Sequence, residues 1–158
     1  MGPYLISINR KPFRKITIRD QHYSEIYFAK QCFSFIKNAL VIKDVNDNKV
    51  ATVTRMISFV VPIYKIELVG CSPIYVKRDF GFCVSYSIKR KQWKVLSNAN
   101  CDKYLVNDLH ETTLYEIKKD LSVLEHDYEL TVAPGNDPLL GMCIAIAVDA
   151  AMCDISRA

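Results

Sequence analysis

Basic side chains at the ends of predicted strands are the residues of this sequence best suited to binding chemistry. The strongest basic run covers residues 89–94 and contains the only tryptophan of the chain, Trp93. Lys77-Arg78 and Lys118-Lys119 lie at corresponding ends of repeated strands, so they could share one rim of the fold. Such cations bind phosphate oxygens, and tryptophan favours a membrane–water interface. The candidate contacts for an anionic lipid headgroup or phosphate are Lys77, Arg78, Lys89, Arg90, Lys91, Trp93, Lys94, Lys118 and Lys119.

These basic residues allow other interpretations. Arg10-Lys11 and Arg14-Lys15 add a basic hairpin near the N-terminus, and the whole set could contact nucleic-acid phosphates instead of lipid. The residues could also have no ligand and simply prevent aggregation at hairpin ends and sheet edges, which is the more common role of such charges and the interpretation favoured here. The formal charge of +4 is too small to imply an anionic partner. We expect no nucleic-acid partner.

The sequence contains no clear catalytic or metal-binding pattern. Residues 44–48 resemble the start of a calcium loop, but Lys49 and Arg55 occupy the places that need glycine and glutamate, which favours a hairpin turn. Glu125-His126-Asp127 favours a hairpin tip, because neighbouring strand residues point to opposite faces. The chain has no G-x-S-x-G motif and no glycine-rich phosphate loop. We therefore predict no enzymatic activity, no metal and no cofactor.

The cysteines and the N-terminus favour a cytoplasmic protein. No C-x-x-C pair occurs, so reduced and mostly buried thiols are expected rather than disulfides or a zinc site. The first ten residues fit neither a secretory signal nor, with Pro3 and Ile6, a myristoylation signal. We expect one domain over residues 1–158, a monomer that is cytoplasmic or peripheral at a membrane. The cysteines are Cys32, Cys71, Cys83, Cys101, Cys143 and Cys153.

Most of the chain alternates apolar and polar residues, as half-buried β-strands do. Four segments repeat one plan: a strand, a corner with a basic or polar, an apolar and a small residue, and a return strand. With divergent strand pairs near the N-terminus and across residues 92–108, the pattern predicts roughly ten to twelve strands over about residues 4–132. The aligned corner residues are Ser34, Ser58, Gly81 and Ser122, and Leu40, Tyr64 and Tyr128 open three of the return strands.

Residues 138–153 are predicted to form a helix that the rest of the chain encloses. Asn136 or Asp137 can cap it, and Pro138 suits its first position. The uncharged run ends before Asp149, well short of the about 20 apolar residues of a membrane span, so we expect no transmembrane insertion. We expect Asp149 near the end of the helix, bonded to polar backbone or a basic side chain in a structural role.

Antiparallel strands in such number must close or stack to cover their edges, and an all-round apolar helix fits inside the closure. The predicted fold is a closed antiparallel β-barrel threaded by its C-terminal helix. The hairpin corners, together with residues 136–140 and 144–150, resemble the LURP-one-related family, which is similar in fold to the tubby C-terminal domain and to phospholipid scramblases. The resemblance covers about residues 4–153 and implies about twelve strands around a central hydrophobic helix. It brings no catalytic residues to this chain.

Three functions follow as hypotheses. Tubby domains bind phosphoinositides through basic side chains, so the first is a non-enzymatic intracellular domain that docks on anionic phospholipid, or on a protein partner, through its basic rim. The second is a structural or interaction protein without a ligand. The third is an enzyme with a pocket at the mouth of the barrel.

Overall fold

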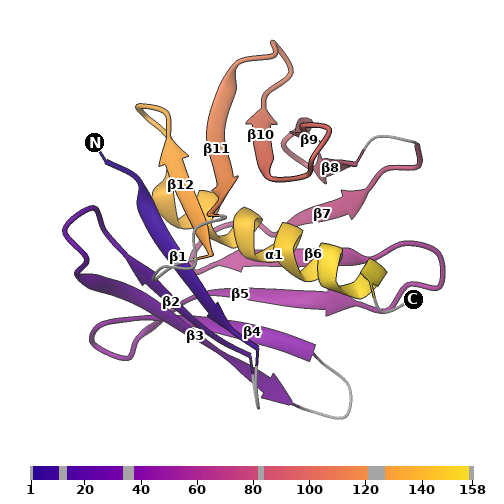
Figure 1. Cartoon of the computed structure of the whole chain (residues 1–158). Helices are drawn as coiled ribbons and strands as arrows, with labels where there is room; N and C mark the ends of the chain where they lie inside the picture. The colour runs from indigo at the N-terminus through magenta and orange to yellow at the C-terminus, as the bar shows by residue number, and fades with distance from the viewer. Residues whose placement is uncertain (1, 11–13, 34–37, 82–83, 121–126, 157–158) are drawn as a thin grey trace.

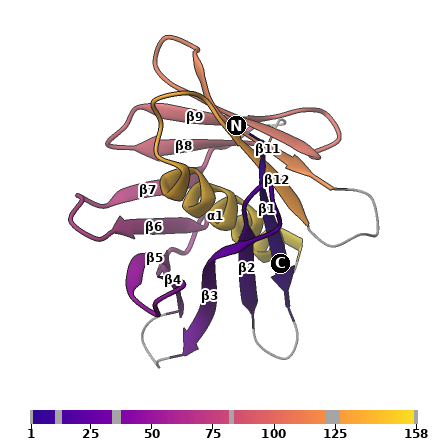
Figure 2. The same cartoon turned by 90° about the vertical axis from the view of Figure 1, so that its left-hand side faces the viewer.

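A closed antiparallel barrel with a helix through it makes up the described part of the chain. The computed structural model describes residues 2–10, 14–33, 38–81, 84–120 and 127–156. Twelve strands close into the barrel around α1, as Figures 1 and 2 show from two directions. This confirms the predicted fold. Ser58 and Gly81 lie in loops between strands. Other positions named from the sequence lie outside the described residues: Lys11, Ser34, Cys83, Ser122, Glu125 and His126.

Each strand pairs with the next along the chain, and β1 pairs with β12 to close the ring. The first six strands are β1 (Tyr4–Asn9), β2 (Lys15–Arg19), β3 (Glu25–Phe33), β4 (Asn38–Asp44), β5 (Lys49–Met56) and β6 (Ile63–Leu68). The second six are β7 (Ile74–Arg78), β8 (Ser85–Lys89), β9 (Trp93–Ser97), β10 (Lys103–Asn107), β11 (Thr113–Lys119) and β12 (Tyr128–Val132).

Strand alternation places one face of each strand against α1. In β10, Tyr104 and Val106 are buried, while the residues on either side of them are half-buried. Inward side chains of this kind on all the strands form the core together with the helix. The divergent region is a regular strand pair, with Tyr104 opposite Ser97 and Asn107 opposite Lys94.

The helix α1 (Pro138–Ser156) is enclosed as predicted. Asp137 caps it, because its Oδ1 accepts the Leu139 N–H at 2.9 Å. Every residue from Leu140 to Ala151 is buried, including Asp149. Among the described residues, no helix is both long and apolar enough to span a bilayer.

The direction of α1 distinguishes the two ends of the barrel. The odd-numbered strands run towards the end of α1 and the even-numbered strands run back, because consecutive strands are antiparallel. We call the opening beside the last turns of α1 the helix-end mouth; it includes the loop at 57–62 and residues 79–81 after β7, and it lies to the right in Figure 1. The opposite opening, with the turns at 20–24, 44–48 and 108–112, is the helix-start mouth.

Three turns of the helix-start mouth share one construction. Asp20, Asp44 and Asp108 each accept two backbone N–H bonds through Oδ1, from the residues two and four positions later. The residue three positions later has positive φ in each case: Tyr23, Asp47 and Glu111. A short polar side chain that bonds nearby backbone favours such turns. The segment that resembled a calcium loop is therefore a hairpin turn, as predicted.

Candidate functional site

Asp149 is the centre of a charged cluster inside the helix-end mouth. Its side chain is 2% exposed. Its Oδ1 accepts hydrogen bonds from Arg10 Nη2 and from the Tyr128 hydroxyl, both at 2.7 Å, and its Oδ2 accepts one from Arg14 Nη2. A buried carboxylate is tolerated when it is paired and hydrogen-bonded in this way. The expected place and partners of Asp149, near the helix end and against basic side chains, are confirmed.

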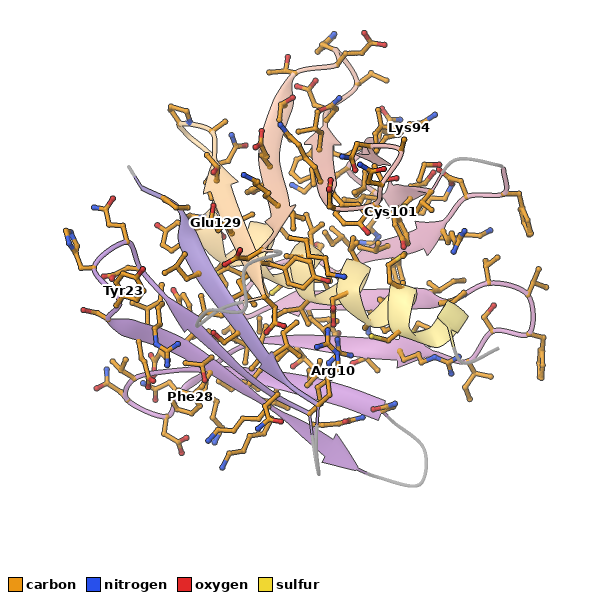
Figure 3. The ribbon with its side chains drawn as sticks, in the orientation of Figure 1. Arg10, Tyr23, Phe28, Lys94, Cys101 and Glu129 are labelled. Carbon is orange, nitrogen blue, oxygen red and sulfur yellow. The ribbon has the colours of Figure 1, made fainter. Side chains whose placement is uncertain are left out.

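Local sequence explains how the two arginines reach the helix. Arg10 follows β1 two positions after the inward-facing Ile8, and Arg14 immediately precedes β2. Both therefore stand at the rim of paired neighbouring strands and reach across the mouth to the last turns of α1, as the labelled Arg10 does in Figure 3. Asp127 adds to the arrangement: its Oδ2 accepts the Ile8 N–H at 2.6 Å, and its Oδ1 lies 3.8 Å from Arg10 Nη1.

A ring of tyrosines lines the barrel wall just inside this mouth. Each return strand from β6 to β12 has a buried tyrosine at its first or second position. The Tyr104 hydroxyl donates to the Cys101 carbonyl at 3.1 Å, whereas the buried Tyr86 hydroxyl has no hydrogen-bond partner among the described residues. The mouth is therefore more polar than the rest of the core. The ring consists of Tyr64, Tyr86, Tyr104 and Tyr128.

Burial and the Asp149 charge dominate the electrostatics of the cluster. Burial, followed by the neighbouring carboxylate, raises the pKa of Tyr128 far above its ordinary value. Burial likewise raises the pKa of Tyr104 to about 12. Although burial opposes the charge of Arg10, Asp149 and the Cys153 side chain hold its pKa above the ordinary value. The phenols are thus neutral donors, and the arginines are fixed positive charges.

A small cavity opens beside this cluster, between α1 and β3 to β6. Its volume is about 110 Å³. Leu40, Val53 and Ala150 supply its apolar lining. Three guanidinium groups and two amides supply most of its polar lining, from Arg10, Arg14, Arg55, Gln31 and Asn38, and Tyr64 and Cys153 complete the described walls.

Two loops beside the same mouth expose large apolar side chains. The loop between β5 and β6 presents Ile57, Phe59 and Val60, and Phe59 is 99% exposed. The loop that follows β7 presents Phe80, which is 76% exposed. The loops are neighbours, because β6 and β7 are paired and Ile63 lies opposite Lys77. Both extend to the right of the barrel in Figure 1.

The structure divides the basic residues named from the sequence between the two mouths. Lys77 and Arg78 end β7, and Lys118 and Lys119 end β11, so these four share the helix-end mouth as the strand repeat predicted. The run at 89–94 spans the turn from β8 to β9, so Lys89, Arg90, Lys91, Trp93 and Lys94 lie at the helix-start mouth.

Trp93 packs against its neighbours at the helix-start mouth. It is half-buried, and its ring lies 6.2 Å from that of Tyr115, at a tilt of 57°. The Lys91 ammonium lies 5.4 Å from the centroid of the indole, in cation–π contact. Arg90 and Lys91 also line a cavity of about 470 Å³ with Asp137 and the start of α1.

The described cysteines and acidic residues suggest no metal site. No three His, Cys, Asp or Glu side chains in the described part of the chain are grouped so that they could hold an ion. Among the described residues, no disulfide joins Cys71, Cys101, Cys143 or Cys153. The expectation that most are buried holds only in part: Cys143 is buried, and burial raises the pKa of its thiol strongly, whereas Cys71 is exposed.

Sequence reasoning named Arg10 and Arg14 as a basic hairpin, but it did not select Arg55 or predict the cavity that the three arginines line. Arg55 lies two positions after the inward-facing Val53, in the inward phase of β5. Arg10 continues the inward phase of Ile8 in the same way. The available signal was a basic residue in the inward phase at a strand end, combined with a buried Asp149 that needs positive partners.

Comparison with known families agrees with the barrel and its central helix. The model of the LURP-one-related family matches residues 6–149, which is most of the chain. The chain belongs to the LURP-one-related family. The match begins within β1 and ends at Asp149, so it includes most of β1, all of β2 to β12 and most of the buried part of α1 of this LURP-one-related barrel. No curated protein and no solved structure matched the chain in two further comparisons.

Proposed function

We propose that this LURP-one-related domain is a non-enzymatic module that docks on anionic phospholipid surfaces through its helix-end mouth. The observation that carries the proposal is the pair of neighbouring loops with exposed Ile57, Phe59, Val60 and Phe80. Large apolar side chains that gather on one surface mark sites of interaction. Residues 57–63 carry no charge, so the loop can enter the headgroup region without burying an ionised group.

Charge at the same mouth selects the partner. Lys77 and Arg78 lie between the two loops, and Lys118 and Lys119 lie on the same mouth farther around the barrel. Near an anionic membrane each such cation contributes about 1 kcal/mol. Asp79, the acidic residue beside Phe80, accepts hydrogen bonds from Ser85 and Ser87. Apolar tips flanked by cations complement an anionic bilayer better than a neutral surface.

The chemistry of the mouth supports binding over catalysis. The arginines of the cavity do not exchange protons near neutral pH, and Asp149 is engaged by three hydrogen bonds. Cytoplasmic location and a monomeric state stay predictions from the sequence. A protein partner and a role without a ligand are alternative outcomes of the test below.

Co-sedimentation with vesicles tests the proposal. We expect the protein to sediment with vesicles of phosphatidylcholine and phosphatidylserine but not with phosphatidylcholine alone, and to bind less at physiological salt than at low salt. Phe59→Ser should weaken binding by about tenfold or more, because a phenylalanine that leaves water contributes about 1.5–3 kcal/mol. Lys77→Glu should weaken it by about 30-fold at low salt, since it reverses one charge.

Matched substitutions at the helix-start mouth serve as controls. Leu109 is an exposed apolar side chain of a turn there, and Lys49 is an exposed cation at the start of β5. Leu109→Ser and Lys49→Glu should leave binding within about twofold of the wild type. Reversing Lys89, Arg90 and Lys91 together asks whether the helix-start mouth contributes. No binding to either vesicle type at low salt would overturn the proposal and direct the search to a protein partner.

A further inference from the structure

The cavity in the helix-end mouth concentrates positive charge from two separate segments. Arg10 and Arg14 come from the first hairpin, and Arg55 comes from the end of β5. The described residues that line it include no acidic side chain. Asp149 lies behind the lining, next to Ala150, and accepts one Nη2 bond from each of Arg10 and Arg14. The carboxylate thereby fixes both guanidinium groups at the edge of the cavity.

Arg14 retains unused donor capacity within this arrangement. Its side chain is only 16% exposed, so its position is well defined by its surroundings. Its buried Nε–H has no hydrogen-bond partner among the described residues. An arginine carries five N–H donors in a planar fork, and leaving one buried and unpaired costs free energy. An anion that accepts from this donor would remove that cost.

The size and lining of the cavity limit what it can hold. Its volume of about 110 Å³ exceeds the roughly 10–15 Å³ that one water requires and is well below the roughly 300–1,000 Å³ of typical sites for larger ligands. Guanidinium groups bind the oxygens of phosphate in bidentate fashion, and amide groups add further donors. One compact oxyanion, rather than a whole nucleotide or acyl chain, fits this space.

We infer that the cavity is a binding site for a phosphomonoester group, held by Arg10, Arg14 and Arg55 with Gln31 and Asn38 at its side. Asp149 is a positioning residue, because it orients two of the arginines from outside the cavity. This inference goes beyond membrane docking by the loops, since a soluble phosphate compound could fill the site without a membrane. The same group could also be the headgroup of a lipid that the docked mouth reaches.

The first experiment uses soluble probes and needs no membrane. Inorganic phosphate or glycerol 3-phosphate at 10 mM should raise the Tm by about 3–6 °C over chloride at equal ionic strength, if the Kd is about 1 mM. Arg55→Gln should weaken binding by about tenfold or more. The affinity of Arg55→Lys should lie between those of the wild type and Arg55→Gln, because lysine keeps the charge but loses the bidentate geometry. Lys49→Gln is the matched control: it removes an exposed cation at the other end of β5.

The second experiment compares two anionic lipids. Phosphatidic acid has a phosphomonoester headgroup, whereas phosphatidylglycerol has a phosphodiester. If the lipid is the source, vesicles of phosphatidic acid should bind more tightly than vesicles of phosphatidylglycerol at matched surface potential, and Arg55→Gln should abolish the preference but leave loop-dependent binding.

The outcomes separate this site from the docking loops. A Tm shift that Arg55→Gln removes and Phe59→Ser preserves supports a soluble ligand, even if vesicle binding fails. A lipid preference that Arg55→Gln removes, without a soluble shift, supports the headgroup. The inference is overturned if neither probe distinguishes the wild type from Arg55→Gln, or if Lys49→Gln has the same effect.

Discussion

Asp149 shows how one buried charge orders a whole end of this barrel. A carboxylate inside a hydrophobic helix is costly unless its partners compensate it. Here Tyr128 at the start of β12, Arg10 just after β1 and Arg14 just before β2 all hydrogen-bond to it. These three strands are neighbours in the barrel, because β1 pairs with both β12 and β2. The cluster therefore ties the last strand, the first hairpin and the end of α1 together.

At the residue scale, Asp149→Asn should lower the free energy of unfolding by about 2–4 kcal/mol. Removing one member of a buried ion pair leaves the other charges uncompensated, and the partial exposure of Arg10 and Arg14 reduces the full penalty. Urea unfolding measures the change.

Asp47→Asn provides the matched control for this substitution. Asp47 is exposed and pairs with Lys43 at 2.9 Å, so its loss should cost no more than about 1 kcal/mol. Equal losses of stability in the two variants would contradict the structural role of Asp149.

At the element scale, Gly141 determines how closely α1 packs on the barrel wall. A Cβ at this position would lie 2.4 Å from an edge carbon of the Tyr115 ring. The ring is held in place, because its hydroxyl donates to the Asp137 carbonyl at 3.0 Å, next to the helix cap. The glycine is thus needed for close approach at the end of the first turn of α1, although glycine costs up to about 1 kcal/mol relative to alanine within a helix.

Gly141→Ala should therefore destabilise the protein by about 1–2 kcal/mol, although alanine is the better helix former. Overpacking of about 1–3 kcal/mol outweighs the gain in helix propensity. In a Tyr115→Leu background, which makes room, the same substitution should be neutral or stabilising. Thermal unfolding of the wild type, the two single variants and the double variant gives the coupling energy between the two positions. If Gly141→Ala destabilised the Tyr115→Leu variant as much as it destabilises the wild type, the proposed contact would be contradicted.

Regular patterns made the elements predictable, whereas contacts across the barrel were not. The apolar run after Pro138 and the period-two alternation predicted α1, the strands and the divergent pair at 92–108. The sequence showed the aromatic residues that open the return strands one at a time, but it did not show that they form one ring, because this depends on how the strands pair in the barrel. Arg55 is far in sequence from Arg10 and Arg14, so only the pairing of β2 with β3, of β3 with β4 and of β4 with β5 brings the three arginines to one cavity.

At the scale of the whole molecule, the buried tyrosines predict loss of stability at high pH. The pKa values of Tyr104 and Tyr115 rise from 10.0 to about 12 through burial. Between pH 10 and pH 12 the unfolded chain releases these protons and the folded protein keeps them, so stability falls as pH rises. Each phenol should lower the free energy of unfolding by up to about 2–3 kcal/mol over this range.

Urea unfolding at pH 9, 10.5 and 11.5, followed by tyrosinate absorbance, checks this prediction. Ionisation of the buried phenols should accompany unfolding, and the slope of stability against pH should be smaller in Tyr104→Phe. A slope that this variant leaves unchanged would exclude Tyr104 as a source of the effect.

The positions of two aromatic side chains allow a direct test of which mouth meets the membrane. Trp93, the only tryptophan, lies at the helix-start mouth, and Phe59 lies at the helix-end mouth. Phe59→Trp combined with Trp93→Phe moves the fluorescent group from one end of the barrel to the other.

The measurement is quenching of tryptophan fluorescence by brominated acyl chains in anionic vesicles. Docking through the helix-end mouth predicts strong quenching at position 59 and little quenching of Trp93 in the wild type. Quenching of Trp93 without quenching at position 59 would contradict the account and place the docking surface at the opposite mouth.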